Sequence, residues 1–240
     1  MAYTNSPLVS YTKLSPNHSG QRTHSIDRIT PHCVVGQCSV EMLGNIFLPA
    51  SRQASCNYGI GADGRVGMDG EEKNRSWCSS SNANDQRAIT IECASDTAEP
   101  YAFKGVVYQK LIELCTDICK RNGKTKLLWL GDKTKTLGYT PKPDEMVLTV
   151  HRWFANKSCP GNWMYARMGD LAEKVTAQLN RKQTQTKDNA AAAWSRDAVD
   201  WAVANKLMTG DENGDLMLRS PVTREQFCVL LKRYHDVVQK

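Results

Sequence analysis

The sequence predicts an α/β protein made of one large domain and a small helical module. Short apolar runs typical of strands recur between residues 30 and 150, and amphipathic helices lie between and after them. A length of 240 residues exceeds an average domain and falls short of two. Residues 183–193 are polar or alanine and contain no aromatic side chain, which indicates a linker. We therefore assign residues 1–182 to the large domain and residues 194–240 to the module.

The expected strands are short and separated by turn-forming residues. The segment before Arg28 is polar and interrupted by proline, so we expect an arm laid over the domain. Residues 56–66 predict a hairpin, because Asp63 and Gly64 supply a turn between two apolar runs. In the run at residues 87–94, Glu92 alternates with two isoleucines and should lie on the opposite strand face. The remaining strands are expected at residues 30–36, 127–130 and 146–150.

Apolar residues at helical spacing predict the helices. The clearest covers residues 101–123 and ends at Asn122 and Gly123. Thr223 and Gln226 have the spacing of a capping box at the start of the last helix. The others are expected at residues 39–47, after Asp170, and at residues 195–206. The two helices of the module bury little surface, so we expect it to need the large domain or another copy for stability.

Composition excludes several classes of protein. No stretch approaches 18 apolar residues, so we expect no membrane insertion. The net charge of +6 lies in the first 182 residues, with 23 Lys+Arg against 17 Asp+Glu, and no basic stripe with interleaved aromatics accompanies it. We therefore expect no nucleic-acid partner. The nine cysteines form no CxxC pair, which argues against a disulfide framework.

Two histidines and one cysteine could form a metal site. His32 and His151 each end an expected strand, and Cys159 follows eight residues after the second. Two imidazoles and one thiolate would give zinc three protein ligands and leave a fourth position for water, as hydrolysis requires. Spacing alone leaves open that these are ordinary structural residues.

Five segments, taken in order, resemble the zinc-dependent N-acetylmuramoyl-L-alanine amidases of phage and prophage endolysins, which are related to the peptidoglycan recognition proteins. They are residues 31–33 (PHC), 57–65 (NYGIGADGR), 72–78 (EKNRSWC), 88–92 (AITIE) and 149–161 (TVHRWF through KSCPG). The resemblance runs from about residue 29 to residue 180. It implies a mixed central sheet flanked by helices, and cleavage of the amide between N-acetylmuramic acid and L-alanine.

The resemblance also implies the roles of individual residues. The family's zinc ligands correspond to His32, His151 and Cys159, with one Zn²⁺ per chain. Its acidic residue near the metal corresponds to Glu92, and its lysine two places before the last ligand to Lys157. A carboxylate can accept a proton from water, and a lysine can stabilise an oxyanion.

Further residues are candidates for the site on weaker grounds. Some family members place a tyrosine near the metal where this chain has Cys56. Tyr58 lies two residues on, and either serves in its place or packs as an ordinary strand aromatic. We also expect substrate contacts from Asn57, Arg75, Trp77 and Trp153, while each tryptophan fits a core position equally well.

The module resembles a single S-layer homology repeat, at residues 200–210 and 222–227. That family anchors proteins to secondary polysaccharides of the cell wall, and Trp201 and Arg224 are the expected contacts. A structural helix pair, or one that associates with a second copy of the chain, is the alternative.

The resemblance predicts a peptidoglycan hydrolase of the endolysin type. Residues 1–15 lack the apolar segment of a signal peptide. We therefore expect the protein to stay in the host bacterial cytoplasm until a separately encoded pore-forming protein breaches the membrane, and then to reach the wall. The alternative function is a non-catalytic peptidoglycan-binding protein of the same fold, which Cys159 disfavours because it completes the metal ligands.

Overall fold

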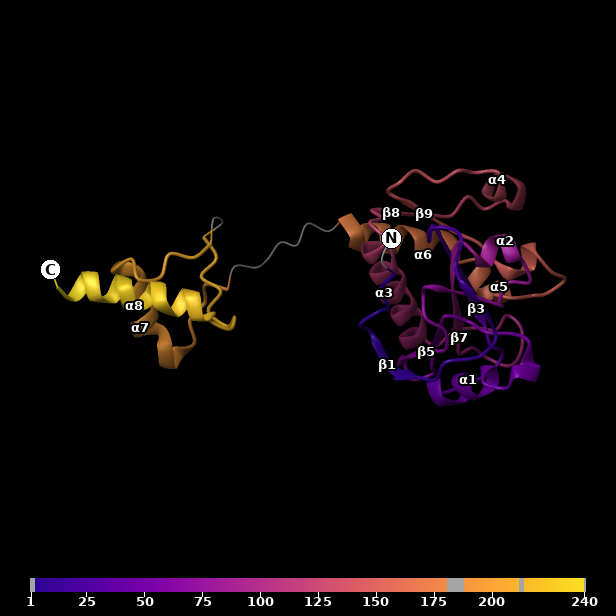
Figure 1. Cartoon of the computed structure of the whole chain (residues 1–240), viewed down its shortest axis with the longest axis horizontal. Coiled ribbons are helices and arrows are strands. Elements are labelled where there is room, and N and C mark those ends of the chain that lie inside the picture. The colour runs from indigo at the N-terminus through magenta and orange to yellow at the C-terminus, as the bar shows by residue number, and fades with distance from the viewer. Residues whose placement is uncertain (1–2, 181–187, 212–213, 240) are drawn as a thin grey trace. The chain divides into compact units, whose positions relative to one another are not determined.

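A computed structural model of the chain describes residues 3–180, 188–211 and 214–239. The chain divides into two compact units, Met1–Arg181 and Lys182–Lys240, which Figure 1 draws together. The linker expected at residues 183–193 lies partly outside the described residues. The first unit contains a sheet with helices on both faces, so the predicted α/β class is confirmed.

A seven-stranded sheet runs through the first unit. In spatial order its strands are β1 (Val9–Thr12), β5 (Val66–Met68), β4 (Tyr58–Ile60), β7 (Ala88–Cys93), β3 (Arg28–Cys33), β9 (Glu145–Leu148) and β8 (Lys126–Leu128). Neighbouring strands pair in parallel except β4 and β5, the predicted hairpin, which is antiparallel. A second, two-stranded sheet pairs β2 (His18–Gln21) with β6 (Asn74–Ser76).

One face of the large sheet is apolar and carries the main core. Ile29 of β3 and the isoleucines of β7 pack with two long helices, α3 (Gly105–Arg121) and α6 (Met168–Asn180). Leu111 and Leu114 of α3 are fully buried there. Helix α3 ends as predicted, with Asn122 as its C-cap and Gly123 at φ +66°.

Helix α1 (Val40–Phe47) packs on the opposite face, where glycines allow a close approach. A Cβ atom on Gly59 would lie 2.8 Å from Leu43 Cδ1. Successive residues of a strand point to opposite faces, so Tyr58 and Ile60 face the core while Gly59 faces α1. Short helices complete the unit: η1 (Ala50–Arg52), α2 (Asn82–Asp85), α4 (Lys133–Leu137), η2 (His151–Trp153) and α5 (Gly161–Tyr165).

The polar segment before Arg28 does more than cover the domain. Its residues Val9–Thr12 form β1, which pairs in parallel with β5 at the edge of the sheet. Ser6, Ser15 and Asn17 are buried. The expectation of a simple arm was wrong because backbone pairing with a strand about 55 residues away, rather than local apolar content, makes this segment a strand.

The second unit contains η3 (Ala193–Ser195), α7 (Arg196–Ala204) and α8 (Arg224–Val238). The predicted capping box between Thr223 and Gln226 is present at the start of α8. Large apolar side chains remain exposed, including Trp194 at 91% and Phe227 at 56%. No helix of the described residues is both long and apolar enough to cross a membrane.

Gly161 is a position where only glycine fits. It lies at φ +81°, and a Cβ atom there would lie 2.8 Å from the backbone oxygen of Pro100. We predict that Gly161→Ala lowers the free energy of unfolding by about 1–3 kcal/mol, from left-handed strain and the clash. Gly105→Ala is the control, because nothing lies within 4 Å of its added Cβ. Urea unfolding compares the two, and equal stabilities would contradict the prediction.

Candidate active site

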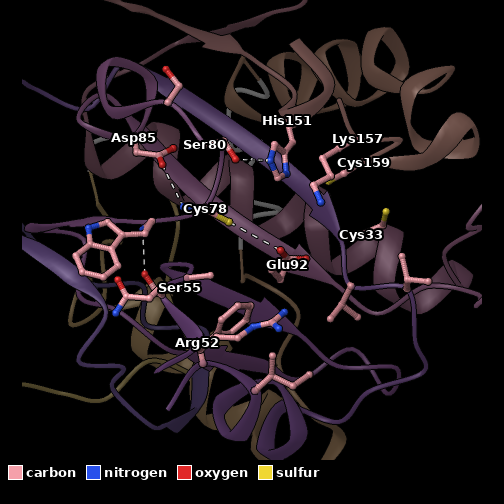
Figure 2. Close-up of a pocket in the computed structure, with 18 of the residues that line it drawn as sticks. Cys33, Arg52, Ser55, Cys78, Ser80, Asp85, Glu92, His151, Lys157 and Cys159 are labelled. Atoms are coloured by element: carbon pink, nitrogen blue, oxygen red, sulfur yellow. Dashed lines mark hydrogen bonds between the residues drawn. The ribbon is translucent and has the colours of Figure 1, made fainter. Parts of the chain in front are cut away.

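A cleft of about 800 Å³ opens where β3, β7 and β9 end. Its walls come from η1, from residues 75–85 and from the segment after β9, as Figure 2 shows. Six of the site residues expected from the sequence line it, among them Arg75, Trp77, Glu92, His151 and Lys157. Cys159 also lines the cleft, while His32 lies buried behind it, at the end of β3.

His32, His151 and Cys159 converge although the chain separates them widely. One ligand atom from each lies within 4.8 Å of the others. Cys159 Sγ lies 3.2 Å from His32 Nδ1, and the two imidazole centroids are 5.1 Å apart. His32 Nε2 is buried and has no hydrogen-bond partner among the described residues. His151 Nε2 pairs with the Ser80 hydroxyl at 3.0 Å.

The surroundings keep both imidazoles neutral. Burial, and then the nearby His151, hold the pKa of His32 well below 6.5. Burial and the Lys157 ammonium lower the pKa of His151. A hydrogen bond with Cys33 and burial raise the pKa of the Cys159 thiol. Neutral imidazole is the form that binds metals, and a thiol with a raised pKa ionises when a cation joins it.

Glu92 lies beside this cluster on the face of β7 that the alternation predicts. Its Oε1 lies 3.9 Å from His32 Nδ1 and 3.9 Å from Cys78 Sγ, while its Oε2 is buried without a partner among the described residues. Burial raises the pKa of Glu92 to about 7, against the lowering effect of the Cys78 hydrogen bond. A carboxyl with a pKa near neutrality can both accept and return a proton.

A polar network beneath the cleft fixes the strands that carry these groups. The hydroxyls of Thr30 and Thr149 lie 2.7 Å apart, joining β3 to the end of β9. Asn84 donates to Thr30 Oγ1 at 3.0 Å and accepts from Thr149 Oγ1 at 3.0 Å. Each of these side chains is fully buried, and each has its partner, so the polar layer avoids the cost of unsatisfied groups.

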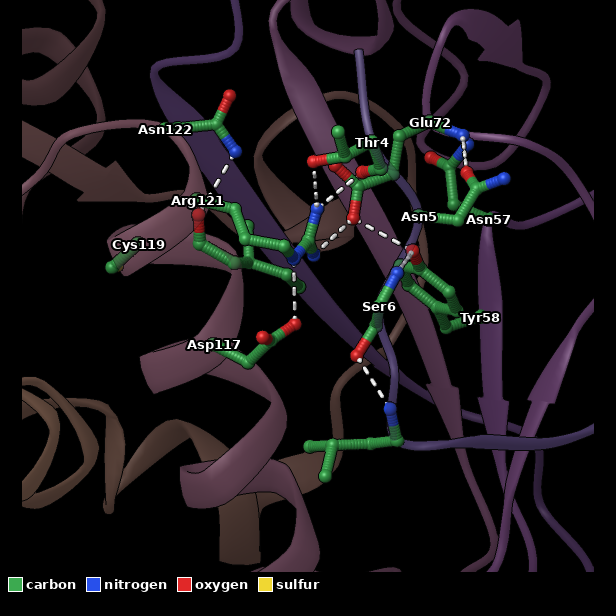
Figure 3. Close-up of polar contacts among 12 residues, drawn as sticks. Thr4, Asn5, Ser6, Asn57, Tyr58, Glu72, Asp117, Cys119, Arg121 and Asn122 are labelled. Carbon is green, nitrogen blue, oxygen red and sulfur yellow. Dashed lines mark hydrogen bonds and ion pairs between the residues drawn. The ribbon is translucent and has the colours of Figure 1, made fainter. Parts of the chain in front are cut away.

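The structure does not bring Tyr58 or Asn57 into the cleft. The β4–β7 register pairs Tyr58 with Ile91 and Gly59 with Glu92, so the Tyr58 side chain lies on the core face. Its hydroxyl donates to Glu72 Oε1 at 2.7 Å and accepts from the Ser6 amide at 2.9 Å (Figure 3).

The Asn57 side chain serves the polar layer under the sheet. Its Oδ1 accepts from Arg22 Nη2 at 2.9 Å and from the Thr90 amide at 3.2 Å. It is fully buried and does not line the cleft. Both Tyr58 and Asn57 therefore occupy structural positions.

The other proposed contacts divide between two places. Arg75 and Trp77 line the cleft, where both bond to the Ser19 hydroxyl; the Trp77 Nε1 bond is 2.7 Å. Trp153 is mostly buried, stacks on Trp129 with ring centroids 5.0 Å apart, and lines a neighbouring pocket instead.

Sequence reasoning did not single out several residues of the cleft, among them Cys78, Ser80 and Arg52. Cys78 contacts Glu92, and Ser80 contacts His151. Arg52 on η1 lines the cleft wall near Glu92. Cys78 is the last residue of the quoted motif at residues 72–78, a signal that could have drawn attention to it. A second group of donor atoms within 4.8 Å combines His32, Cys78 and Glu92. Nothing local marks Arg52 or Ser80.

The family model described as N-acetylmuramoyl-L-alanine amidase matches residues 14–162, more than half of the chain. The chain belongs to this family. The match covers β2 through the start of α5 and includes every residue proposed above for the cleft. No curated protein matches the chain.

Several solved structures are similar to the chain at low identity. The structure of PlyL is 12% identical, with a TM-score of 0.49, over 69% of this chain and 95% of that one. An AmpD derivative is 17% identical, with a TM-score of 0.49, over 72% and 99%. The endolysin amidase LysCS from Clostridium intestinale is 17% identical, with a TM-score of 0.44, over 72% and 97%.

Proposed function

We propose that the protein is a peptidoglycan hydrolase of the endolysin type, which cleaves the amide between N-acetylmuramic acid and L-alanine with one Zn²⁺ per chain. The observation that carries the proposal is the meeting of His151 and Cys159, which line the cleft, with the buried His32 beside Glu92. Membership of the amidase family supports the same reaction.

The donor groups suit zinc. Two neutral imidazoles and a sulfur form a set of intermediate softness, which favours zinc over magnesium or calcium. The short contact between His32 Nδ1 and Cys159 Sγ, with Glu92 Oε1 3.9 Å from the same nitrogen, fits a group of atoms that a cation would join. A bound zinc ion supplies Lewis acidity, which makes water acidic enough to act as a nucleophile near pH 7.

The side chains around the metal ligands supply the remaining chemistry. Glu92 accepts the proton of the attacking water at Oε2, the oxygen that Cys78 does not contact. It then returns the proton to the leaving amine of L-alanine. Lys157, exposed at the cleft wall, stabilises the negative charge that develops on the carbonyl oxygen. Arg75 and Trp77 contact the glycan or peptide along the cleft.

The choice between Cys159 and Cys78 as the metal ligand tests the metal assignment. We predict that Cys159→Ser or His151→Ala loses zinc and hydrolysis, because each removes a ligand. Cys78→Ser is the matched control, and it keeps one zinc per chain. Metal analysis and release of free amino groups from purified walls, without new reducing ends, measure the two properties. Full activity of a metal-free preparation would refute the assignment, and zinc loss in Cys78→Ser alone would move the site to His32, Cys78 and Glu92.

The role of Glu92 can be separated from metal binding. We predict that Glu92→Gln keeps its zinc and loses about 10²–10⁴-fold in kcat, since the amide preserves size but accepts no proton. Tyr58→Phe is the comparison: it keeps kcat and lowers stability by about 1–3 kcal/mol, because it leaves the Glu72 carboxylate short of a buried partner. Unchanged turnover in Glu92→Gln would mean that another group carries the proton.

We propose that the second unit adds affinity for the wall, through Trp201 and Arg224 and a secondary cell-wall polysaccharide. Trp201 is 49% exposed, and Arg224 begins α8, where it is exposed. The exposed apolar side chains of the unit equally suit contact with the first unit or with a second copy of the chain.

Removal of the second unit tests this proposal. A chain ending at Lys182 contains every proposed ligand, so we predict that it binds zinc and hydrolyses soluble muropeptides at the full rate. Its binding to whole walls should fall. Wall pull-down, a muropeptide assay and size in solution compare the two chains. Loss of both zinc binding and activity on soluble substrates would show that the second unit belongs to the catalytic fold.

A further inference from the structure

A second pocket, of about 520 Å³, adjoins the cleft, since Ser80 and Ser81 line both. We call it the basic pocket, because Arg28, Arg87 and Lys133 line it and none of its lining residues is Asp or Glu. Its other walls are the neutral side chains of Ala83, Asn84, Leu137, Trp153 and Phe154.

Arg28 carries a buried positive charge that has no carboxylate partner among the described residues. Its residue surface is only 5% exposed. The guanidinium has one hydrogen-bond acceptor, Asn84 Oδ1 at 3.3 Å, and that oxygen is shared with the Thr149 hydroxyl. Buried guanidinium groups are normally paired with an anion. No residue that lines the basic pocket therefore supplies a counterion for the buried guanidinium of Arg28.

The neighbouring cations increase this excess of positive charge. Arg87 donates to Asp27 at 2.8 Å, so the one nearby carboxylate is already used. Burial, and then the positive charge of Arg87, lower the pKa of Arg28 to about 10 against the opposing attraction of Asp27, which leaves Arg28 charged at neutral pH. Lys133 is exposed on α4 and has no ion pair among the described residues. The pocket therefore favours an anionic ligand.

Arg28 of the basic pocket lies on the same strand face as His32, one of the proposed metal ligands. Arg28, Thr30 and His32 alternate along β3 and so share one face. Four residues of strand separate Arg28 from His32, or about 13 Å. An extended peptide of about four residues covers that distance.

We propose that the basic pocket binds a carboxylate of the peptide stem while the scissile amide lies in the cleft. This inference rests on the proposed function. In a peptidoglycan strand the muramic acid carboxyl is consumed in the amide and the sugars are neutral, so the anionic groups belong to the peptide. Leu137 and Phe154 offer apolar contacts to an aliphatic side chain beside that carboxylate. The pocket thus selects stems whose carboxyls are free.

Kinetics on a matched pair of soluble substrates test this selection. One is an N-acetylmuramyl tetrapeptide with free stem carboxylates, and the other is the same molecule with those carboxylates amidated. For the full-length zinc enzyme we expect KM to be about tenfold or more higher for the amidated form, with kcat unchanged, because hydrogen bonds to a charged group are lost.

Variants assign the selection to the pocket. Arg28→Gln should bring the two KM values together, and Lys133→Met should reduce their ratio. Lys135→Met is the control, since Lys135 lies on the same short helix, is exposed and does not line the pocket. If Arg28→Gln does not fold, Lys133→Glu replaces it, and its charge reversal should reduce the ratio further. A ratio that stays at the wild-type value in Arg28→Gln and in Lys133→Glu, or a wild-type ratio of one, would overturn the proposal.

A binding measurement separates this inference from the proposed function. The free tetrapeptide, which lacks the scissile amide, should bind the full chain in calorimetry and bind more weakly to Lys133→Glu than to Lys135→Met. If the zinc-loaded full chain hydrolysed neither substrate, the proposed function would be refuted. The difference in tetrapeptide binding between Lys133→Glu and Lys135→Met would still test the pocket. Equal binding by the two variants would refute the pocket assignment.

Discussion

The parallel pairing of β3 with β7 is the constraint on which the rest of the site depends. Its register sets His32 opposite Glu92 and Ile29 opposite Ile89. Alternation then sends the isoleucines to the core beneath α3 and the two polar groups to the cleft. A shift of either strand by one residue would turn its polar group, the imidazole of β3 or the carboxyl of β7, into the apolar core and away from the other. Packing of the core and chemistry of the cleft are therefore selected by the same register.

The cleft face carries an unusual density of buried polar groups, and their pairing explains how the fold tolerates them. Beneath the proposed metal ligands, hydrogen bonds join the side chains of Thr30, Thr149 and Asn84. Beside them, the side chain of Asn57 accepts hydrogen bonds from Arg22 and from the Thr90 amide. The exceptions are informative. His32 Nε2 and Glu92 Oε2 are among the few buried polar atoms that have no partner in the described part of the chain. Unsatisfied atoms of this kind cost free energy. Glu92 Oε2 is the oxygen that the proposed reaction uses, and His32 Nε2 belongs to the ring whose other nitrogen contacts Cys159.

Sequence patterns correctly predicted those elements whose structure depends mainly on neighbouring residues. The central strands, α3, the β4–β5 hairpin and the cap of α8 follow from alternation, helical spacing and turn residues. Strand β1 and the one-turn helices α4 and α5 were missed, because long-range pairing or packing on a formed domain stabilises them. Tyr58 was a candidate through its motif, yet the register with Ile91 turns it to the core. Arg28 gave no signal at all, since its burial without a carboxylate exists only in three dimensions.

Charge links the whole first unit to its substrate. The net +6 lies entirely in residues 1–182, where 23 cations face 17 anions, while the remainder has 8 of each. Part of the surplus is held at fixed positions: Lys157 at the metal end of the cleft and Arg28 about four strand residues away. The anionic peptide stem that we propose as the ligand would meet a positive charge at both ends of this face. Under the two proposals, long-range attraction and local selection act along the same line, because the charges that steer the ligand are also those that contact it.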